Sequence, residues 1–339
     1  MKDSQERLEG FLKAAIPGLS GDLRLERVAG GQSNPTFFAS FDNRRLVIRK
    51  KPDGAVLPSA HAIDREYRVL EALARMDIAV PPVLLYHEAG DVLGTSFYVM
   101  ERVDGRVFHD GQLAAAPKGE RVEMYRSAAR MLAAIHRVDF ERAGLSTFGK
   151  HGNFFNRQIA RWTKQWHLSK MDDDIPEIDR LIEWLPANLP AGDQTTIVHG
   201  DFRIGNIMFH PVEPRIVAVL DWELSTLGHP MADLAHTCIY GWYVTPEEYG
   251  GLLGLDLPAH GLPTLDAFTA AYYEASDQKD RLGVFHIALA LFRNAVIFQG
   301  IASWAKAGNA NAGNATDVGR LASTFARRAV ELIETSEKG

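Results

Sequence analysis

The sequence contains the stretch His199-Gly200-Asp201-Phe202-Arg203-Ile204-Gly205-Asn206, and a second acidic segment, Asp221-Trp222-Glu223, follows it closely. Between these two segments, two short apolar runs lie on either side of a turn-forming run. Ile207 to Phe209 is a short apolar run, Pro211 to Pro214 favours a turn, and Ile216 to Leu220 is a second apolar run. This pattern predicts two short antiparallel strands joined by a turn, with polar residues at both open ends.

The predicted hairpin gathers three polar side chains. Its pairing places Asn206 opposite Asp221, and residues directly opposite each other have Cβ atoms roughly 4.5–5.5 Å apart. Oxygens from such a pair reach one Mg²⁺, whose ligands lie at about 2.0–2.1 Å. Asp201 lies in the loop that enters the hairpin, where a base would orient a hydroxyl group, so the set indicates phosphoryl transfer from ATP. A plain turn followed by a helix cap is the alternative for either element alone.

The composition is that of an ordinary globular protein. The chain has 339 residues, of which 46% are hydrophobic and 24% charged, and this length favours two lobes or domains. A net charge of −6 argues against nucleic acid or an anionic membrane as a partner. The single cysteine, Cys238, and an N-terminal segment without the pattern of a signal peptide predict a cytoplasmic protein. Polar residues interrupt the most apolar window, Val284 to Trp304, which predicts a core helix rather than a membrane span.

The first hundred residues predict strands with one inserted helix. Strands are expected at 23–29, 36–41 and 45–50. The glycine turn between the first two lets backbone N–H groups approach a phosphate, and its candidate nucleotide-binding residues are Gly30, Gly31, Ser33 and Asn34. An ordinary hairpin turn is the alternative. The chain has neither a P-loop nor a Gly-x-Gly-x-x-Gly motif, which removes the main support for Walker-type and Rossmann folds.

Two residues of the third strand are candidates for nucleotide contact. Val47 and Arg49 point to the same side, so Val47 is placed to meet adenine and Arg49 to reach phosphate. The helix predicted from Ser59 to Met76 carries Glu66 on its apolar stripe, and Arg49 is a candidate partner for that carboxylate. On the same helix, Arg65 and Arg68 are expected to face water. An exposed strand-end cation is the alternative for Arg49.

The apolar strand Phe97 to Met100 leads into a glycine-containing connector that resembles a hinge. By analogy with kinases, the backbone at Glu101 and Val103 is expected to pair with the edge of adenine. Helical patterns follow, so we expect a nucleotide-binding lobe at residues 1–103 and a catalytic and substrate-binding lobe at residues 104–339. Within the second lobe, Trp162 and Trp166 share a helix face and either cover the core or form a substrate wall.

These motifs resemble the aminoglycoside phosphotransferase-like superfamily, which shares the bilobal fold of protein kinases and includes choline and fructosamine kinases. The match extends from about residue 20 to residue 330. The residues at 46–52, 59–61, 65–67, 199–203 and 228–234 look most like the phosphotransferase domain that is fused to, or encoded near, acyl-CoA dehydrogenases. The resemblance implies an α+β fold, with an antiparallel-sheet N-lobe that holds one helix and a mainly helical C-lobe.

The resemblance also implies roles for individual residues. Asp201 would accept the proton of the substrate hydroxyl, and Arg203 occupies the place where many kinases have a lysine that touches the transferred phosphate. Asn206 and Asp221 would hold Mg²⁺, and Asp233 would be a structural carboxylate. Most relatives have lysine at the position of Arg49, and the planar arginine fork differs from a point-like ammonium group.

The sequence therefore predicts an ATP- and Mg²⁺-dependent kinase that phosphorylates a hydroxyl of a small molecule. A hydroxyacyl-CoA or hydroxy acid is the first expectation for the acceptor, and it rests on the resemblance; cations at Arg157, Arg161 and Lys164 are candidates for contact with CoA phosphates. An aminoglycoside or other amino alcohol is the alternative acceptor, with the acids at 172–174 as its candidate contacts. A non-catalytic nucleotide-binding regulator with the same fold is the remaining alternative. The sequence does not indicate an oligomeric state.

Overall fold

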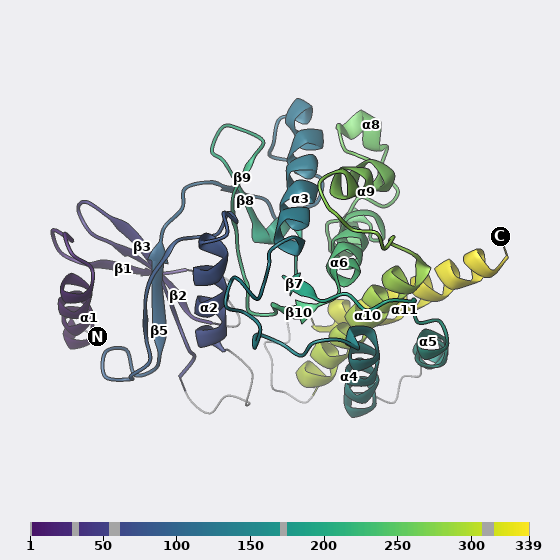
Figure 1. The fold of residues 1–339 in the computed structure, drawn as a ribbon, viewed down its shortest axis with the longest axis horizontal. Helices are drawn as coiled ribbons and strands as arrows, with labels where there is room; N and C mark the ends of the chain where they lie inside the picture. The colour runs from purple at the N-terminus through teal and green to yellow at the C-terminus, as the bar shows by residue number, and fades with distance from the viewer. Residues whose placement is uncertain (1, 29–33, 54–61, 170–174, 307–314, 339) are drawn as a thin grey trace. The chain divides into compact units, whose positions relative to one another are not determined.

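The computed structural model of the chain describes residues 2–28, 34–53, 62–169, 175–306 and 315–338 (Figure 1). The chain forms two compact units. The first unit, called the sheet unit below, comprises residues 1–107, 138–148 and 206–225, and the second, the helical unit, comprises residues 108–137, 149–205 and 226–339. The sheet unit thus takes in two later segments of the chain, and the predicted lobe boundary at residues 103 and 104 stays a prediction.

The sheet unit is built on a five-stranded antiparallel sheet of order β1-β2-β3-β5-β4. Its strands are β1 (Arg24–Arg27), β2 (Thr36–Ser40), β3 (Arg45–Lys50), β4 (Val83–His87) and β5 (Phe97–Glu101). Two helices accompany the sheet, α1 (Lys2–Ala15) and α2 (Ile63–Ala74), and Figure 1 shows them on opposite sides of it. The three strands predicted at the start of the chain are confirmed within two residues at each end.

Alternation along β3 gives the sheet two different faces. Leu46 and Ile48 pack in a hydrophobic cluster with Leu8 and Leu12 of α1. The intervening residues therefore point to the other face, where α2 lies. A strand with period-two alternation thus separates the apolar layer around Leu46 and Ile48 from the face that carries Arg49.

Helix α2 differs in detail from its prediction. It starts at Ile63, with Ala62 at the N-cap position, and the predicted cap Ser59 lies outside the described residues. Glu66 is buried, as predicted. The expectation that Arg65 and Arg68 face water is wrong, because both are partly buried: Arg65 donates to the Phe148 carbonyl at 2.7 Å and Arg68 to the Gly144 carbonyl at 2.8 Å. Both acceptors belong to the segment 138–148, which sequence periodicity alone does not place beside this helix.

The predicted hairpin is present as β8 (Ile207–Phe209) and β9 (Ile216–Val219), and β6 (Arg106–Val107) extends it to a sheet of order β6-β8-β9. Its register corrects one expectation. Ile207 pairs with Val219, and the amide of Leu220 donates to the Asn206 carbonyl at 2.8 Å. Asn206 therefore lies opposite Leu220, and Asp221 follows one residue later, because the register shifts between Met208 and Phe209.

The helical unit contains the remaining elements. These are η1 (Lys118–Glu120), α3 (Arg121–His136), α4 (Phe154–Ser169), α5 (Pro176–Ala187), β7 (Thr196–Val198), β10 (Thr226–Gly228), α6 (Pro230–Trp242), α7 (Pro246–Tyr249), α8 (Leu257–His260), α9 (Leu265–Glu274), α10 (Val284–Lys306) and α11 (Ala315–Glu337). Strands β7 and β10 pair antiparallel. The short helix η2 (Ile204–Asn206) leads into β8.

Helix α10 is the central element of the helical unit and packs against α4, α5, α6 and α11. Among the described residues, its segment Val284–Trp304 is the one helical stretch whose length and composition would allow it to cross a membrane. Within the structure, however, 72% of its most apolar part is buried. Cys238 of α6 is likewise fully buried. The polar residues that interrupt the apolar surface of α10 include His286 and Arg293, which line a cavity described below.

Candidate active site

The loop between β7 and η2 is held in place by Asp233 of α6. This carboxylate is 2% exposed, and it accepts hydrogen bonds from the backbone N–H groups of His199 at 2.6 Å and Gly200 at 2.8 Å. Nε2 of His136 lies 3.4 Å from Oδ2 of the same carboxylate. Burial acts to raise the pKa of Asp233, but the contact with His136 and the backbone donors outweigh burial, and the pKa is lowered. A structural carboxylate expected from the resemblance thus anchors the His-Gly-Asp turn.

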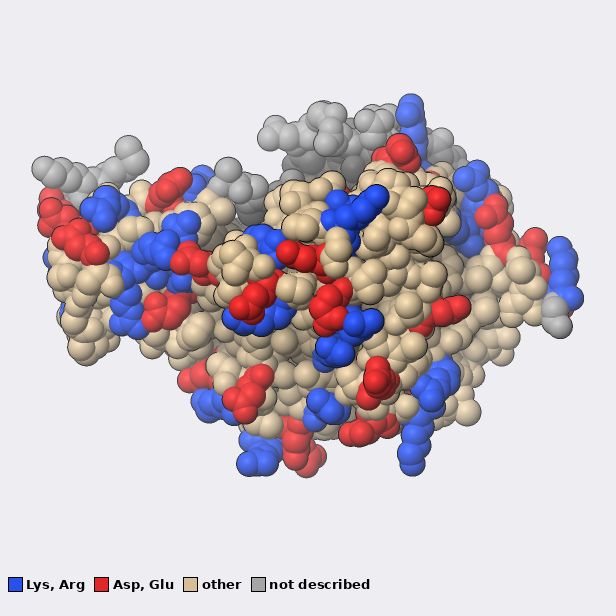
Figure 2. All heavy atoms as spheres, turned by 90° about the horizontal axis from the view of Figure 1, so that it is seen from above, with Lys and Arg blue, Asp and Glu red and all other residues tan. Residues whose placement is uncertain are grey.

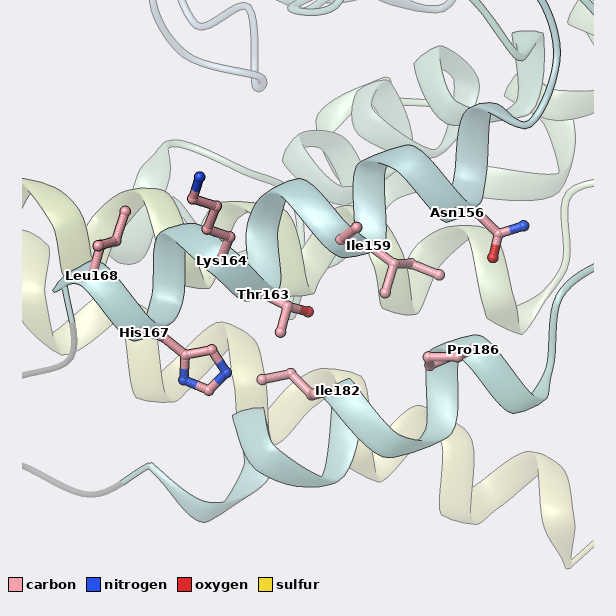
Figure 3. Close-up of a pocket in the computed structure, with 9 residues that line it drawn as sticks. Asn156, Ile159, Thr163, Lys164, His167, Leu168, Ile182 and Pro186 are labelled. Carbon is pink, nitrogen blue, oxygen red and sulfur yellow. The ribbon is translucent and has the colours of Figure 1, made fainter.

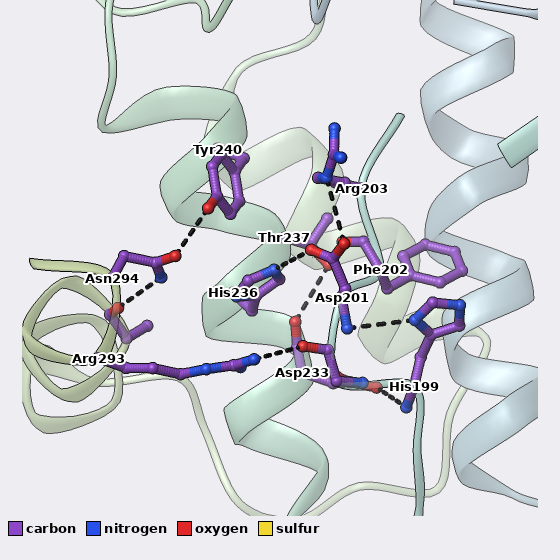
Figure 4. A network of polar contacts seen from close by, with 12 residues as sticks. His199, Asp201, Phe202, Arg203, Asp233, His236, Thr237, Tyr240, Arg293 and Asn294 are labelled. Atoms are coloured by element: carbon purple, nitrogen blue, oxygen red, sulfur yellow. Dashed lines mark hydrogen bonds and ion pairs between the residues drawn. The ribbon is translucent and has the colours of Figure 1, made fainter. Parts of the chain in front are cut away.

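Asp201 is fixed by a histidine that the sequence did not indicate (Figure 4). His236, three residues after Asp233 on α6, lies with Nε2 2.8 Å from Oδ1 of Asp201. An ionised carboxylate only accepts, so Nε2 of His236 carries the proton and donates. Burial acts to raise the pKa of Asp201, yet this hydrogen bond and the nearby cationic side chains prevail and lower it. Asp201 is therefore an ionised acceptor at neutral pH.

Arg203 reaches the other oxygen of the same carboxylate. Its Nε lies 3.4 Å from Oδ2 of Asp201, and its side chain is 33% exposed. The turn behind it is closed by Thr237, whose hydroxyl donates to the Phe202 carbonyl at 2.8 Å. Gly205 leaves room for the Arg203 side chain, because a Cβ atom at position 205 would lie only 2.6 Å from Nη1 of Arg203. The structure thus brings together the two residues predicted to be catalytic.

In the sheet unit, Arg49 and Glu66 form the predicted ion pair. Nη1 of Arg49 is 2.7 Å from Oε1 of Glu66, and the two side chains are 13% and 1% exposed. Burial raises the pKa of Glu66 to about 7, although the charge of Arg49 opposes the shift. A guanidinium held this way keeps a fixed position, which is what a residue that aligns phosphates requires.

The same arginine also faces the two acids that follow β9. Nη2 of Arg49 lies 3.5 Å from Asp221 and 3.8 Å from Glu223. Asp221 has φ +65°, a left-handed conformation that is uncommon for residues other than glycine, asparagine and aspartate and often marks a functional position. The predicted metal ligand Asn206 is 7% exposed. Sequence reasoning named Asp221 and missed the ionic contact of Glu223, which the spacing Asp-x-Glu after an apolar strand would have suggested.

Of the other predicted nucleotide-binding residues, the structure describes some but not all. Gly30, Gly31 and Ser33 lie outside the described residues. Asn34 is 2% exposed, and neither atom of its amide group has a hydrogen-bond partner among the described residues. Val47 is buried opposite Met100 in the sheet.

The predicted hinge residues are partly buried. The Glu101 carboxylate pairs with Arg44, and the Glu101 amide donates to the Pro82 carbonyl at 2.8 Å. Val103 is half-buried. The adenine contact predicted for the backbone at Glu101 and Val103 stays a prediction.

Among the described residues of the helical unit, two hollows border α4. One is a groove of about 600 Å³ between α4 and α5, lined mainly by apolar residues together with Lys164 and His167, and Figure 3 shows His167 pointing toward Ile182 of α5. The other is a cavity of about 40 Å³ between α4 and α10, which Trp162 and Arg293 help to line. Trp166, the partner of Trp162 on the predicted face, is fully buried in the core. Trp166 therefore covers the core, whereas a substrate-facing role for Trp162 stays a prediction.

The fold and these polar residues define a class of protein. Residues 24–273 match the model of a family described as the phosphotransferase enzyme family, and the chain belongs to that family. The fold is the predicted α+β fold of kinase-like proteins, with an antiparallel sheet and a mainly helical part.

Individual proteins and solved structures are similar to this chain over most of its length. Acyl-CoA dehydrogenase family member 10 of Mus musculus is 39% identical over 336 residues, which is 96% of this chain and 31% of that protein. The chain thus spans about a third of this relative's length. A crystal structure from Ralstonia eutropha JMP134, named provisionally as an aminoglycoside phosphotransferase, is 41% identical, has a TM-score of 0.89 and covers 97% of this chain and 98% of that one. A spectinomycin phosphotransferase solved with ADP and spectinomycin shares the fold at a TM-score of 0.64 and 12% identity, over 96% of this chain and 98% of that one.

Proposed function

We propose that the protein transfers the terminal phosphoryl group of ATP to a hydroxyl group of a small molecule. The observation that carries this proposal is Asp201, a carboxylate whose backbone is anchored through Asp233 and whose side chain is oriented by His236. A carboxylate held ionised in this way accepts the hydrogen of a substrate hydroxyl and directs the lone pair of its oxygen. Positioning of this kind supplies much of the catalysis in phosphoryl transfer.

The reaction balances with the residues present. The hydroxyl oxygen forms a bond to the γ-phosphorus while the bond from that phosphorus to the bridging oxygen breaks, and ADP leaves with the bonding pair. The hydroxyl proton passes to Asp201. Because its pKa is low, Asp201 is a weak base, and it takes the proton late, as a loose transition state allows. Arg203 lies 3.4 Å from the other carboxylate oxygen, which supports the proposal that it contacts the transferred group.

The sheet unit offers residues that fit the nucleotide and its metal. Asn206 and Asp221 would supply the hard oxygen ligands that Mg²⁺ prefers, and Arg49, held by Glu66, would supply a cation for phosphate. Among the described residues, no group of three or more His, Cys, Asp or Glu is arranged to hold a metal ion. This suits Mg²⁺, which usually takes one or two protein carboxylates and completes its shell with water and substrate phosphates. When bound, the ion neutralises charge on the phosphates.

The family and the solved neighbours support this class of reaction, and the ADP in the spectinomycin phosphotransferase supports a nucleotide as the donor. For the acceptor, a hydroxyacyl-CoA or a hydroxy acid remains our first proposal and an aminoglycoside the second. A cytoplasmic location and the absence of nucleic-acid and membrane partners also remain proposals. On the face shown in Figure 2, basic and acidic side chains are interspersed, which agrees with a small-molecule substrate.

The test is ADP release from ATP and Mg²⁺ in the presence of hydroxy acids, hydroxyacyl-CoA esters, amino alcohols and aminoglycosides. The wild-type protein and Asp201→Asn are compared, with Asp266→Asn, an exposed aspartate of α9, as the matched control. We expect an acceptor-dependent rate that falls at least a hundredfold in Asp201→Asn and is unchanged in the control. Equal rates for the wild type and Asp201→Asn would refute the proposal.

A further inference from the structure

Arg293 is a partly buried cation that forms no ion pair with an acidic side chain among the described residues. Its Nη2 donates to the Gly200 carbonyl at 2.9 Å, and its Nε is buried with no hydrogen-bond partner among the described residues. No carboxylate of those residues lies within ion-pair distance of it. Burial lowers the pKa of Arg293, as expected for a cation whose charge is incompletely balanced. An arginine in this state favours binding of an anion or a strong hydrogen-bond acceptor.

His286 adds a second unused donor to the same cavity. Its Nδ1 accepts a hydrogen bond from the Gly283 amide at 3.0 Å, so the proton of the neutral ring is on Nε2. That Nε2 is buried and has no partner among the described residues, and the residue is 5% exposed. Burial lowers the pKa of His286 to about 4, so the ring is neutral at neutral pH and donates a single hydrogen.

The cavity between α4 and α10 has the size and lining of a small-group site. Its volume of about 40 Å³ leaves room for about three water-sized atoms. Its lining combines the two donors with apolar and amide groups, from Phe154, Gln158, Trp162, Ala232, His286, Leu289, Ala290 and Arg293. A sugar ring does not fit in this space, but a carboxylate or a carbonyl group does.

The cavity also lies next to the residue proposed as the base. Arg293 bonds to Gly200, which directly precedes Asp201 (Figure 4). We propose that Arg293 and His286 bind an acyl oxygen of the phosphate acceptor, as a free carboxylate or as the carbonyl of a thioester, while its hydroxyl lies at Asp201. This inference rests on the proposed kinase function and narrows the acceptor to hydroxy acids and their thioesters. An aminoglycoside or amino alcohol would place an ammonium group against the guanidinium, which is unfavourable.

The test is isothermal titration in the absence of ATP, which separates this proposal from the kinase activity. The probes are 3-hydroxybutyrate and 4-hydroxybutyrate, the CoA thioester of each, and 1,3-butanediol and 4-aminobutan-1-ol as analogues without an acyl group. We expect the wild-type protein to bind either the free hydroxy acids or their CoA thioesters. Whichever of the two binds shows whether the acyl oxygen belongs to a carboxylate or to a thioester carbonyl. The failure of the kinase proposal would appear separately, as ADP release that does not respond to Asp201→Asn.

Three variants locate the binding. Arg293→Met is expected to weaken it about ten- to a hundredfold, the cost of a hydrogen bond from a charged group. His286→Phe is expected to weaken it about three- to tenfold, and the ring has no contact with Gly200 that would disturb the Asp201 loop. Lys118→Met, which removes an exposed cation of η1 that does not line this cavity, is the control and should change nothing. The proposal is overturned if no acid or thioester binds, if the diol or amino alcohol binds as tightly, or if both Arg293→Met and His286→Phe bind like the wild type.

Discussion

Replacing Asp233 by asparagine tests how the His-Gly-Asp turn is held. The substitution keeps the size of the side chain but turns one oxygen into an NH₂ group, which cannot accept a hydrogen bond. One of the two backbone donors, His199 at 2.6 Å or Gly200 at 2.8 Å, is then buried without an acceptor. That loss costs about 1–3 kcal/mol, and the remaining bond loses the assistance of the charge, worth about 1 kcal/mol. We expect the free energy of unfolding of the helical unit to fall by about 2–4 kcal/mol.

Urea denaturation followed by tryptophan fluorescence measures this change. Five of the six tryptophans, all except Trp222, lie in the helical unit, so the signal follows that unit. Asp266→Asn, at an exposed position of α9, is the control and should alter stability by less than about 1 kcal/mol. A loss below about 0.5 kcal/mol in Asp233→Asn would refute the role of Asp233 as the anchor.

The pH dependence gives a second check on the same variant. The pKa of Asp233 is lowered in the folded protein, so its stabilising effect is fully present above its unfolded value of about 3.9 and disappears as the pH falls through the folded pKa. The difference in stability between wild type and Asp233→Asn should therefore be constant near neutral pH and shrink below about pH 4. A difference that grows on acidification would contradict the assignment.

Three further changes test other parts of the site. Arg49→Met leaves the Glu66 carboxylate buried without its cation and should destabilise the sheet unit by roughly 3–5 kcal/mol in thermal or urea unfolding, with partial recovery when Glu66→Gln is added; no recovery would argue against the pair. Gly205→Ala should displace the Arg203 guanidinium and lower kcat for ADP release by about ten- to a hundredfold, and an unchanged kcat would show that Arg203 does not need its present position. Asp221→Asn should raise the Mg²⁺ concentration for half-maximal ATP turnover at least tenfold, whereas an unchanged requirement would remove Asp221 from the metal site.

Sequence patterns predicted much of the sheet unit because its signals are local. Alternation along β3 placed Arg49 on one face of the sheet, and the apolar stripe of α2 placed Glu66 on the surface that meets it. The turn between β8 and β9 was evident from its two prolines. The register was one residue off, because strand ends depend on hydrogen bonds that local propensity does not determine. The exposure of Arg65 and Arg68 was misjudged for a related reason: their acceptors lie about eighty residues away in the chain.

The parts of the site that the sequence did not predict come from helix packing. His236 and Arg293 carry no motif of their own, and each acquires a role only because α6 and α10 pack beside the turn that holds Asp201. One signal was present: His286, Arg293, Asn294 and Gln299 interrupt the apolar sequence of α10. A polar residue on a buried helix usually has a partner or a ligand. The identity of that partner required the structure.

Direct detection of the phosphorylated product tests the central proposal most sharply. The protein is incubated with ATP, Mg²⁺ and a pool of hydroxy acids and hydroxyacyl-CoA esters, and mass spectrometry with ¹⁸O-labelled γ-phosphate identifies the acceptor. We predict that a labelled phosphate ester of at least one hydroxylated acceptor forms with the wild-type protein and is absent with Asp201→Asn. Labelled inorganic phosphate alone, or the same ester with both proteins, would contradict the role of Asp201 in transferring phosphate to a hydroxyl group.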